Sequence, residues 1–196
     1  MMWSIKDNLF FLYRAARECA IVLFFFALAV VPFLVPLFDG FGALQWDARE
    51  VHLTNLIFSS RAWHNGFAPL WSPHIFSGFP QIADMQVAVF YPVNLLLGYF
   101  FVFSQQVLFW QIVFHFALAG FGMFLLVRHI TASHIGGLFD GIAYMYSGFM
   151  IGHASHVGMQ NTAAWLPIVM FLALYAFETQ RWPYAVFAGT AAGVAI

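Results

Sequence analysis

Acidic and histidine side chains gather in two parts of this chain, where their types and spacing could support chemistry. Asp39, Asp47 and Asp84 share one polar stretch, while His153 and His156 come much later and stand three residues apart. One helical turn would place both imidazoles on the same face, where they can bind a phosphate group or simply satisfy a polar turn. Two histidines alone make a poor zinc site, because even catalytic zinc takes three protein ligands. Asp84 can hold a metal or orient a base, or it is an ordinary hydrogen-bonded loop acid.

Two arginines accompany the acids. Arg49 and Arg61 lie in the same stretch, and a guanidinium group can bind two oxygens of one phosphate. Contact with anionic lipid headgroups, or pairing with Glu50, would account for them equally well. Both interpretations stay open at this level.

The composition decides which class of protein positions these side chains. Of the 196 residues, 63% are hydrophobic, 26 are phenylalanine and only 8% are charged, whereas a soluble domain carries about 25% charged residues. The mean hydropathy is +0.82. A net charge of −1 excludes a basic surface for nucleic acid, and the single Cys19 excludes an internal disulfide framework. The sequence therefore predicts an all-α polytopic membrane protein.

The charged residues occur in clusters separated by long uncharged windows. Because a bilayer core of about 30 Å needs roughly 20 helical residues, the uncharged or nearly uncharged stretches predict the spans, which are approximately 19–38, 105–127, 133–151 with Asp140 inside it, 161–177 and an incomplete 183–196. The segment 85–103 contains Pro92 and is expected to be interfacial or re-entrant. Since a helix cannot stop halfway through a bilayer, residues 1–196 are expected to be the N-terminal part of one longer transmembrane domain.

Lysine and arginine in the short connections predict the orientation. A cytoplasmic N-terminus leaves Arg49 and Arg61 outside and places five basic residues inside, namely Lys6, Arg14, Arg17, Arg128 and Arg181. The outer loop 39–86 and the turn that carries His153 and His156 then face the same side.

A helix is expected within the outer loop, from Asp47 to about His64. Asp47 can cap it, with Glu50 as the reciprocal partner of a capping box, and Gly66 can end it. An apolar stripe and a polar face predict an amphipathic helix on the membrane surface. The stripe is Leu53, Leu56, Ile57 and Trp63, and the polar face is Arg49, His52, Asn55 and Ser59.

The prolines, glycines and aromatic residues that follow predict a compact loop, and here a resemblance becomes visible. The residues that carry it are Trp46-Asp47, Pro69-Leu70-Trp71-Ser72-Pro73, Phe76-Ser77-Gly78-Phe79-Pro80, Ala83-Asp84, Phe90-Tyr91-Pro92, Ser147-Gly148-Phe149, His153, His156 and Ala164-Trp165-Leu166-Pro167. In this order they resemble the N-terminal part of YfhO-type bacterial membrane proteins, which are similar to GT-C class glycosyltransferases. The resemblance covers most of residues 39–170.

The resemblance implies a GT-C-like helical bundle whose large first extracytoplasmic loop contains interfacial helices. It implies a polyprenyl-phosphate sugar as donor and an envelope acceptor reached from the outer face of the bacterial cytoplasmic membrane. Asp47 would be the general base, with Asp39 as the rival acid. Substrate would be bound by residues of the loop and the later turn, namely Arg49, Arg61, Asp84, His153 and His156. No cofactor is identified, although the chemistry leaves room for a divalent metal, and protein partners are unknown.

Two other functions remain open. In a transporter or flippase for a lipid-linked or envelope precursor, the working residues would be Asp140 and the mid-span His115, because polar groups inside a membrane often mark a transport path. Asp140 could instead pair with Arg128, with the neighbouring glycines allowing close helix packing, and His115 could bond a facing helix. A non-catalytic protein of envelope assembly is the third alternative.

Overall fold

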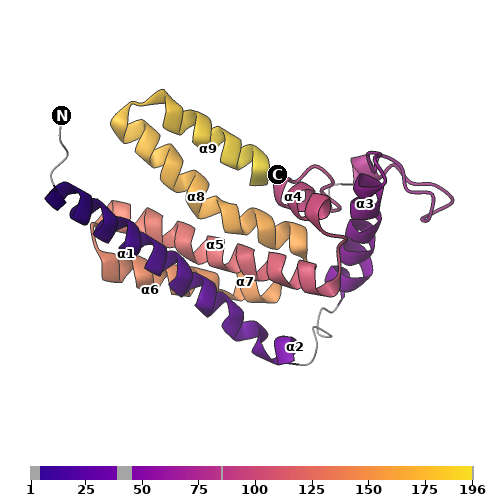
Figure 1. The fold of residues 1–196 in the computed structure, drawn as a ribbon, viewed down its shortest axis with the longest axis horizontal. Helices are drawn as coiled ribbons and strands as arrows, with labels where there is room; N and C mark the ends of the chain where they lie inside the picture. Colours follow the sequence, from indigo (N-terminus) through magenta and orange to yellow (C-terminus); the bar gives the residue numbers. More distant parts are fainter. Residues whose placement is uncertain (1–4, 39–45, 85, 196) are drawn as a thin grey trace.

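The computed structural model describes residues 5–38, 46–84 and 86–195, and these ranges are predominantly helical (Figure 1). The helices are α1 (Ile5–Val30), α2 (Leu34–Phe38), α3 (Thr54–His64), α4 (Pro92–Phe100), α5 (Gln105–Thr131), α6 (His134–Met145), α7 (Gly148–Gly152), α8 (Val157–Thr179) and α9 (Trp182–Ala195). Shorter helical turns occupy Val31–Phe33, Ala48–Leu53 and Gln81–Ala83. One antiparallel bridge, between Ser72 and Phe79, is the only β-pairing in the described ranges. The prediction of an all-α protein is confirmed.

Three segments are long and apolar enough to cross a membrane. They are Ala15–Phe33, Gln105–Thr131 and Val157–Thr179, with 19, 27 and 23 residues. Since roughly 20 residues span a bilayer core, each has the required length, and each overlaps a span predicted from the sequence. The chain is a helical protein with three candidate membrane spans.

The predicted span at 133–151 differs from the structure, because two shorter helices occupy it. α6 has 12 residues and ends at Met145. The Ser147 hydroxyl then accepts a hydrogen bond from the Met150 amide at 3.3 Å and caps the five-residue α7. A serine cap and a following glycine thus interrupt what hydropathy alone presented as one continuous helix.

α5 is the central helix of the bundle. It packs against α1, α6 and α8, and α8 also packs against α9. The innermost side chains include Phe25, Phe109, Phe116, Phe124, Met145 and Met150. Large apolar side chains on the far side of α1, such as Leu23 at 68% exposure, face outward, as expected of helices whose outer surface meets lipid.

Close packing between α5 and α6 depends on glycine. A Cβ atom at Gly141 would lie 2.7 Å from the Gly120 carbonyl oxygen and 2.6 Å from the Phe25 ring, and one at Gly137 would lie 2.9 Å from the Phe124 carbonyl. Backbone atoms cannot rotate away from such contacts. The expectation that glycines near Asp140 allow close helix packing is confirmed.

Of the two alternatives left open for Asp140, the structure does not show the pairing with Arg128. Arg128 Nη1 instead donates to both carboxylate oxygens of Glu18 at 3.0 Å, which joins α1 to α5. The guanidinium also lies 4.7 Å from the centre of the Phe124 ring. Asp140 is half-buried, and no ion pair to it is found within the described ranges.

Pro167 lies inside α8 and has no amide hydrogen, so the Ala163 carbonyl four residues earlier loses its usual helical donor. The Tyr144 hydroxyl of α6 donates to that carbonyl at 2.9 Å. An unpaired carbonyl is expensive in an apolar environment. The tyrosine therefore supplies the hydrogen bond that the proline cannot donate, and it links α6 to α8.

A tyrosine hydroxyl also compensates for a proline at the end of α1. Pro32 lacks the amide that would reach the Leu28 carbonyl, and the Tyr146 hydroxyl donates to this carbonyl at 2.6 Å. Two tyrosines near the end of α6 thus compensate for two prolines in neighbouring helices.

Candidate functional site

Several of the described candidate residues lie at one end of the bundle, where α3, α4 and α7 lie beside the starts of α5 and α8 (Figure 1). Asp47 precedes the helical segment that leads into α3, and His156 immediately precedes α8. Asp47 Oδ2 lies 3.7 Å from His156 Nε2. The structure therefore brings together two sequence motifs that stand more than 100 positions apart.

Asp47 does not cap the helix, so the capping-box prediction is wrong. The segment Ala48–Leu53 is a π-helix that continues into α3, and Asp47 itself has helical backbone angles without a side-chain cap bond. The Arg49 and Glu50 amides donate instead to the Trp46 carbonyl, each at 3.0 Å. Because the backbone already satisfies these amides, the half-buried Asp47 carboxylate remains available to other groups.

The two histidines of the later turn lie close together, as their spacing predicted. Their ring centres are 5.4 Å apart, and His153 stacks on Phe149 at 4.3 Å. His153 Nδ1 lies 3.0 Å from the Phe149 carbonyl oxygen, which requires a proton on Nδ1 and leaves Nε2 for a ligand. His156 Nδ1 is buried with no partner among the described residues.

His52 lies near Asp47, Asp84 and His156, although its position in the helical pattern predicted that it would be on an exposed polar face. Its side chain is only 6% exposed, and burial lowers its pKa while the carboxylates of Asp47 and Asp84 and the Gln86 backbone act in the opposite direction. The imidazole is therefore neutral at pH 7. Its place beside two acids and His156 gives the site a third imidazole.

The predicted polar face of the outer-loop helix is largely buried, so the prediction that this face is exposed to solvent is wrong. Asn55 and Ser59 are buried together with Leu56. Gln81 Nε2 donates to the Asn55 carbonyl at 3.1 Å and to the Ser59 hydroxyl at 2.8 Å. The polar residues thus fix the compact loop to α3. Gly66, with φ at +80°, follows the helix end as predicted.

Asp84 is a hydrogen-bonded loop acid that also faces a cavity. Its Oδ1 accepts the Gln86 amide at 2.8 Å, and the side chain is half-buried. Its carboxylate acts on the pKa of His52, so it belongs to the same group of titratable side chains.

The two outer arginines are not placed alike. Arg49 is exposed and stands two residues after Asp47 on the helical segment, so the two side chains leave it in different directions. Arg61 comes 14 positions after Asp47, which at 1.5 Å per residue is about 20 Å along the helix. It lines a separate cavity of about 350 Å³ with Asn65 and His74. Arg61 and Asp47 do not share one site.

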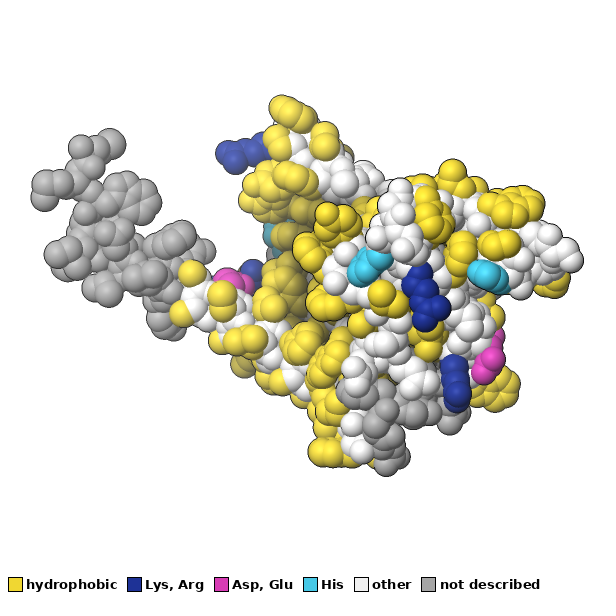
Figure 2. Space-filling view, turned by 45° about the vertical axis from the view of Figure 1, so that its right-hand side comes forward, with side chains coloured by type: hydrophobic (Ala, Val, Ile, Leu, Met, Phe, Trp, Pro, Cys, Tyr) yellow, Lys and Arg dark blue, Asp and Glu magenta, His cyan; other side chains and the backbone are white. Residues whose placement is uncertain are grey.

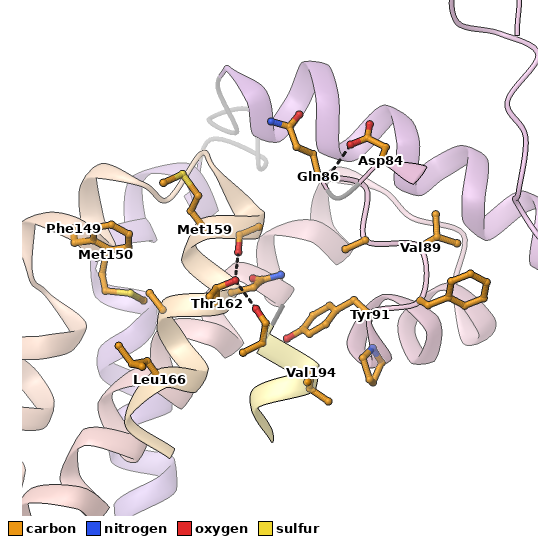
Figure 3. Close-up of a pocket in the computed structure, with 18 of the residues that line it drawn as sticks. Asp84, Gln86, Val89, Tyr91, Phe149, Met150, Met159, Thr162, Leu166 and Val194 are labelled. Atoms are coloured by element: carbon orange, nitrogen blue, oxygen red, sulfur yellow. Dashed lines mark hydrogen bonds between the residues drawn. The ribbon is translucent and has the colours of Figure 1, made fainter. Parts of the chain in front are cut away.

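A cavity of about 970 Å³ opens beside the group of titratable side chains formed by Asp47, His52, Asp84, His153 and His156 (Figure 3). Asp84 and Phe149 connect it to that group, and most of its wall is apolar. Figure 2 shows the same end of the molecule, where charged and histidine side chains are scattered among hydrophobic ones. Volumes of 300–1,000 Å³ are typical of ligand sites.

A buried hydrogen-bond chain holds the cavity wall in place. Trp165 Nε1 donates to the Tyr91 hydroxyl at 2.8 Å, and that hydroxyl lies 2.5 Å from His115 Nε2. His115 Nδ1 lies 2.7 Å from the Gln111 carbonyl oxygen. His115 therefore bonds its own helix and Tyr91, the N-cap residue of the neighbouring α4.

Metal binding depends on clusters of ligands. Across the described ranges, no group of three or more His, Cys, Asp or Glu side chains is arranged to hold a metal ion. Asp39, the rival acid, lies outside the described residues.

Comparisons of the chain with protein-family models, with curated proteins and with solved structures find no match. Its function is therefore argued from the site.

Proposed function

We propose that the chain carries part of the active site of a membrane glycosyltransferase. The donor is a sugar on polyprenyl phosphate, and the acceptor is an envelope hydroxyl reached on the outer face of the bacterial cytoplasmic membrane, with the N-terminus in the cytoplasm. The observation that most supports this proposal is that the Asp47 carboxylate makes no cap bond and lies 3.7 Å from His156 Nε2. A carboxylate used only as a helix cap would be bonded to the backbone instead.

Asp47 acts as the general base in this proposal. It takes the proton of the acceptor hydroxyl while that oxygen forms a bond to the anomeric carbon of the sugar, and the bond from that carbon to the phosphate oxygen breaks. The polyprenyl phosphate leaves with the electron pair. The side chain of Asp47 is 47% exposed, so an acceptor can reach it.

The histidines have complementary roles. A distance of 3.7 Å is too long for a hydrogen bond, but catalytic contacts often tighten only when substrate binds. His156 orients the Asp47 carboxylate, and His153, whose Nδ1 is held by the Phe149 carbonyl, donates from Nε2–H to a phosphate oxygen in its imidazolium form. Arg49 contacts the phosphate or nearby anionic lipid from the exposed side of the helix.

The test compares Asp47→Asn with Glu50→Gln in the full-length chain. Glu50 is exposed on the same helical segment, so Glu50→Gln removes a nearby charge without entering the site. Membrane vesicles from expressing cells, which contain the native acceptor, receive undecaprenyl phosphate bearing radiolabelled glucose, galactose, mannose or N-acetylglucosamine. Asp47→Asn should reduce transfer by about 10²–10⁴-fold, the usual value of general-base assistance, and Glu50→Gln should transfer normally.

Expression and folding should be unaffected by Asp47→Asn, because it breaks no backbone bond and an exposed ion pair contributes about 1 kcal/mol or less. Normal transfer by Asp47→Asn would remove the catalytic role from this residue. Loss in Asp39→Asn alone would assign the role to Asp39. Failure of the wild-type chain to transfer any of the four sugars would contradict the proposal itself for these donors.

A further inference from the structure

Among the described residues that line the large cavity, one buried polar side chain has an atom that the fold itself does not use. Asn161 lines it and is only 7% exposed, and its Oδ1 has no hydrogen-bond partner among the described residues. Burying a carboxamide without partners costs free energy, and this one stands within a candidate membrane span. A carboxamide offers both donors and an acceptor, which is what a hydroxyl group of a ligand requires.

Tyr91 adds an acceptor to the same cavity. His115 Nδ1 must carry a proton to bond the Gln111 carbonyl, so its Nε2 accepts from the Tyr91 hydroxyl. The hydroxyl also accepts from Trp165, which leaves one lone pair. Burial raises the pKa of Tyr91 to about 12, so the phenol stays neutral. Figure 3 shows the Tyr91 side chain directed toward the part of the cavity where Thr162 and Val194 lie.

The charge of the cavity wall excludes a phosphate group as its natural occupant. Asp84 contributes a carboxylate, whereas no lysine, arginine or histidine is present among the residues described around the cavity. A phosphate there would face a negative charge without a compensating cation. An ammonium group could donate to Asp84, to the unpaired Asn161 Oδ1 and to Tyr91 but, having no acceptor, would leave the Asn161 Nδ2–H donors unused, whereas a hydroxyl both donates and accepts. Neutral hydroxyl groups match Asp84, Tyr91 and Asn161 together.

An apolar stripe continues from the cavity along α8. Met159 and Leu166 line the cavity, and Met170 follows four residues later; each of the three is 51% exposed. Spacings of seven and four residues place them on one helix face. A ligand with its polar group in the cavity can therefore lay an acyl chain along this face within the apolar part of the bilayer.

We propose that this cavity binds an uncharged, hydroxyl-bearing lipid, whose hydroxyls bond Asn161, Tyr91 and Asp84 and whose chain lies along the Met159–Met170 face of α8. A glycosylated diacylglycerol has this chemistry. The binding site is independent of glycosyl transfer, because the phosphate of the proposed donor would bind at His153 and not in the cavity.

Lipid competition tests this on the full-length protein in nanodiscs of phosphatidylcholine. The discs contain equal fractions of glucosyl-dioleoylglycerol and dioleoyl phosphatidic acid, and native mass spectrometry counts the lipid that stays bound. Since each additional 1.4 kcal/mol of affinity is tenfold, and two or three hydrogen bonds contribute roughly that much, the neutral glycolipid should be retained at least about tenfold over phosphatidic acid.

Asn161→Leu, of nearly the same shape, should reduce glycolipid retention about five- to tenfold, as expected for one or two lost hydrogen bonds. Thr190→Val is the control, because Thr190 is exposed on α9 and does not line the cavity, and its retention should match wild type. Asp84→Asn keeps an acceptor and should retain the glycolipid as the wild-type chain does, which would not hold if the ligand were an ammonium lipid bound through the negative charge.

Three outcomes would overturn the proposal. They are equal or stronger retention of phosphatidic acid, retention of neither lipid, and unchanged retention of the glycolipid in Asn161→Leu. The first two are measured on the wild-type chain, so they do not depend on the folding of a variant. Transfer activity is not read, so failure here leaves the glycosyltransferase proposal intact, and the reverse also holds.

Discussion

The Tyr144 hydroxyl should stabilise the fold only because Pro167 is present. Tyr144→Phe removes the donor that reaches the Ala163 carbonyl at 2.9 Å. That carbonyl has no helical partner, since residue 167 has no amide hydrogen. An unsatisfied buried polar group costs about 1–3 kcal/mol, although hydrogen bonds between membrane helices average about 0.6 kcal/mol and reach about 1.7. We expect Tyr144→Phe to lower the free energy of unfolding by about 1–2 kcal/mol.

A double-mutant cycle isolates this effect. In a Pro167→Ala background the amide of residue 167 can bond the Ala163 carbonyl, so Tyr144→Phe should then cost less than about 0.5 kcal/mol. The coupling energy should be about 1 kcal/mol, above the roughly 0.3–0.5 kcal/mol within which independent sites add. Direct effects of Pro167→Ala on the helix cancel in the cycle.

The assay is a denaturant titration of the full-length chain in one fixed detergent. Tyr99→Phe is the matched control, because Tyr99 is 72% exposed, and it should leave stability unchanged. If Tyr144→Phe costs the same in both backgrounds, the hydroxyl does not substitute for the missing amide and the argument fails.

Three further predictions concern pH, packing and topology. Burial lowers the pKa of His52 below its value in the unfolded chain, so stability should fall as pH drops below about 6.5, by at most about 1.4 kcal/mol per pH unit. Denaturant titrations at several pH values should show a shallower fall in His52→Gln. Gly141→Ala should be about 1–3 kcal/mol less stable than Gly189→Ala by the same titration, because only the Cβ at 141 meets backbone, while the helix-propensity gain is common to both. In a Cys19→Ala chain, a cysteine at the exposed Ala68 should react with membrane-impermeant maleimide in intact cells; reaction only after permeabilisation would reverse the predicted orientation.

The helical class and the membrane spans could be predicted because they depend on composition and segment length. An uncharged window of about 20 residues has few alternatives to a membrane helix, and three such windows overlap the helices observed. The break after Met145 could not be predicted from hydropathy, since Ser147 and Gly148 add no charge to the stretch that follows Asp140. It depends on a single side-chain cap.

The outer-loop helix shows the limit of amphipathic patterns. Its extent to His64 was predicted, but the pattern assigned His52, Asn55 and Ser59 to water, and they are buried. Polar side chains can face inward when partners are present, and Gln81 comes from a loop more than 20 positions away. The spacing of polar residues along one helix does not show which partners a distant loop supplies.

The meeting of Asp47 and His156 combines a predictable and an unpredictable step. α5 runs away from the outer-loop end and α6 with α7 returns, so two antiparallel passes must bring the 153–156 turn back to the end where α3 lies (Figure 1). Any chain with this number of passes would do the same. The 3.7 Å contact requires more, because the Ala48–Leu53 segment and the 153–156 turn must also lie side by side at that end, and the number of passes does not determine this. The break between α6 and α7 lies on this return path, just before the turn that carries His156, so the feature that hydropathy missed belongs to the segment that positions His156. A substitution that fused α6 and α7 would therefore be expected to move His156 away from Asp47 while leaving the membrane spans unchanged.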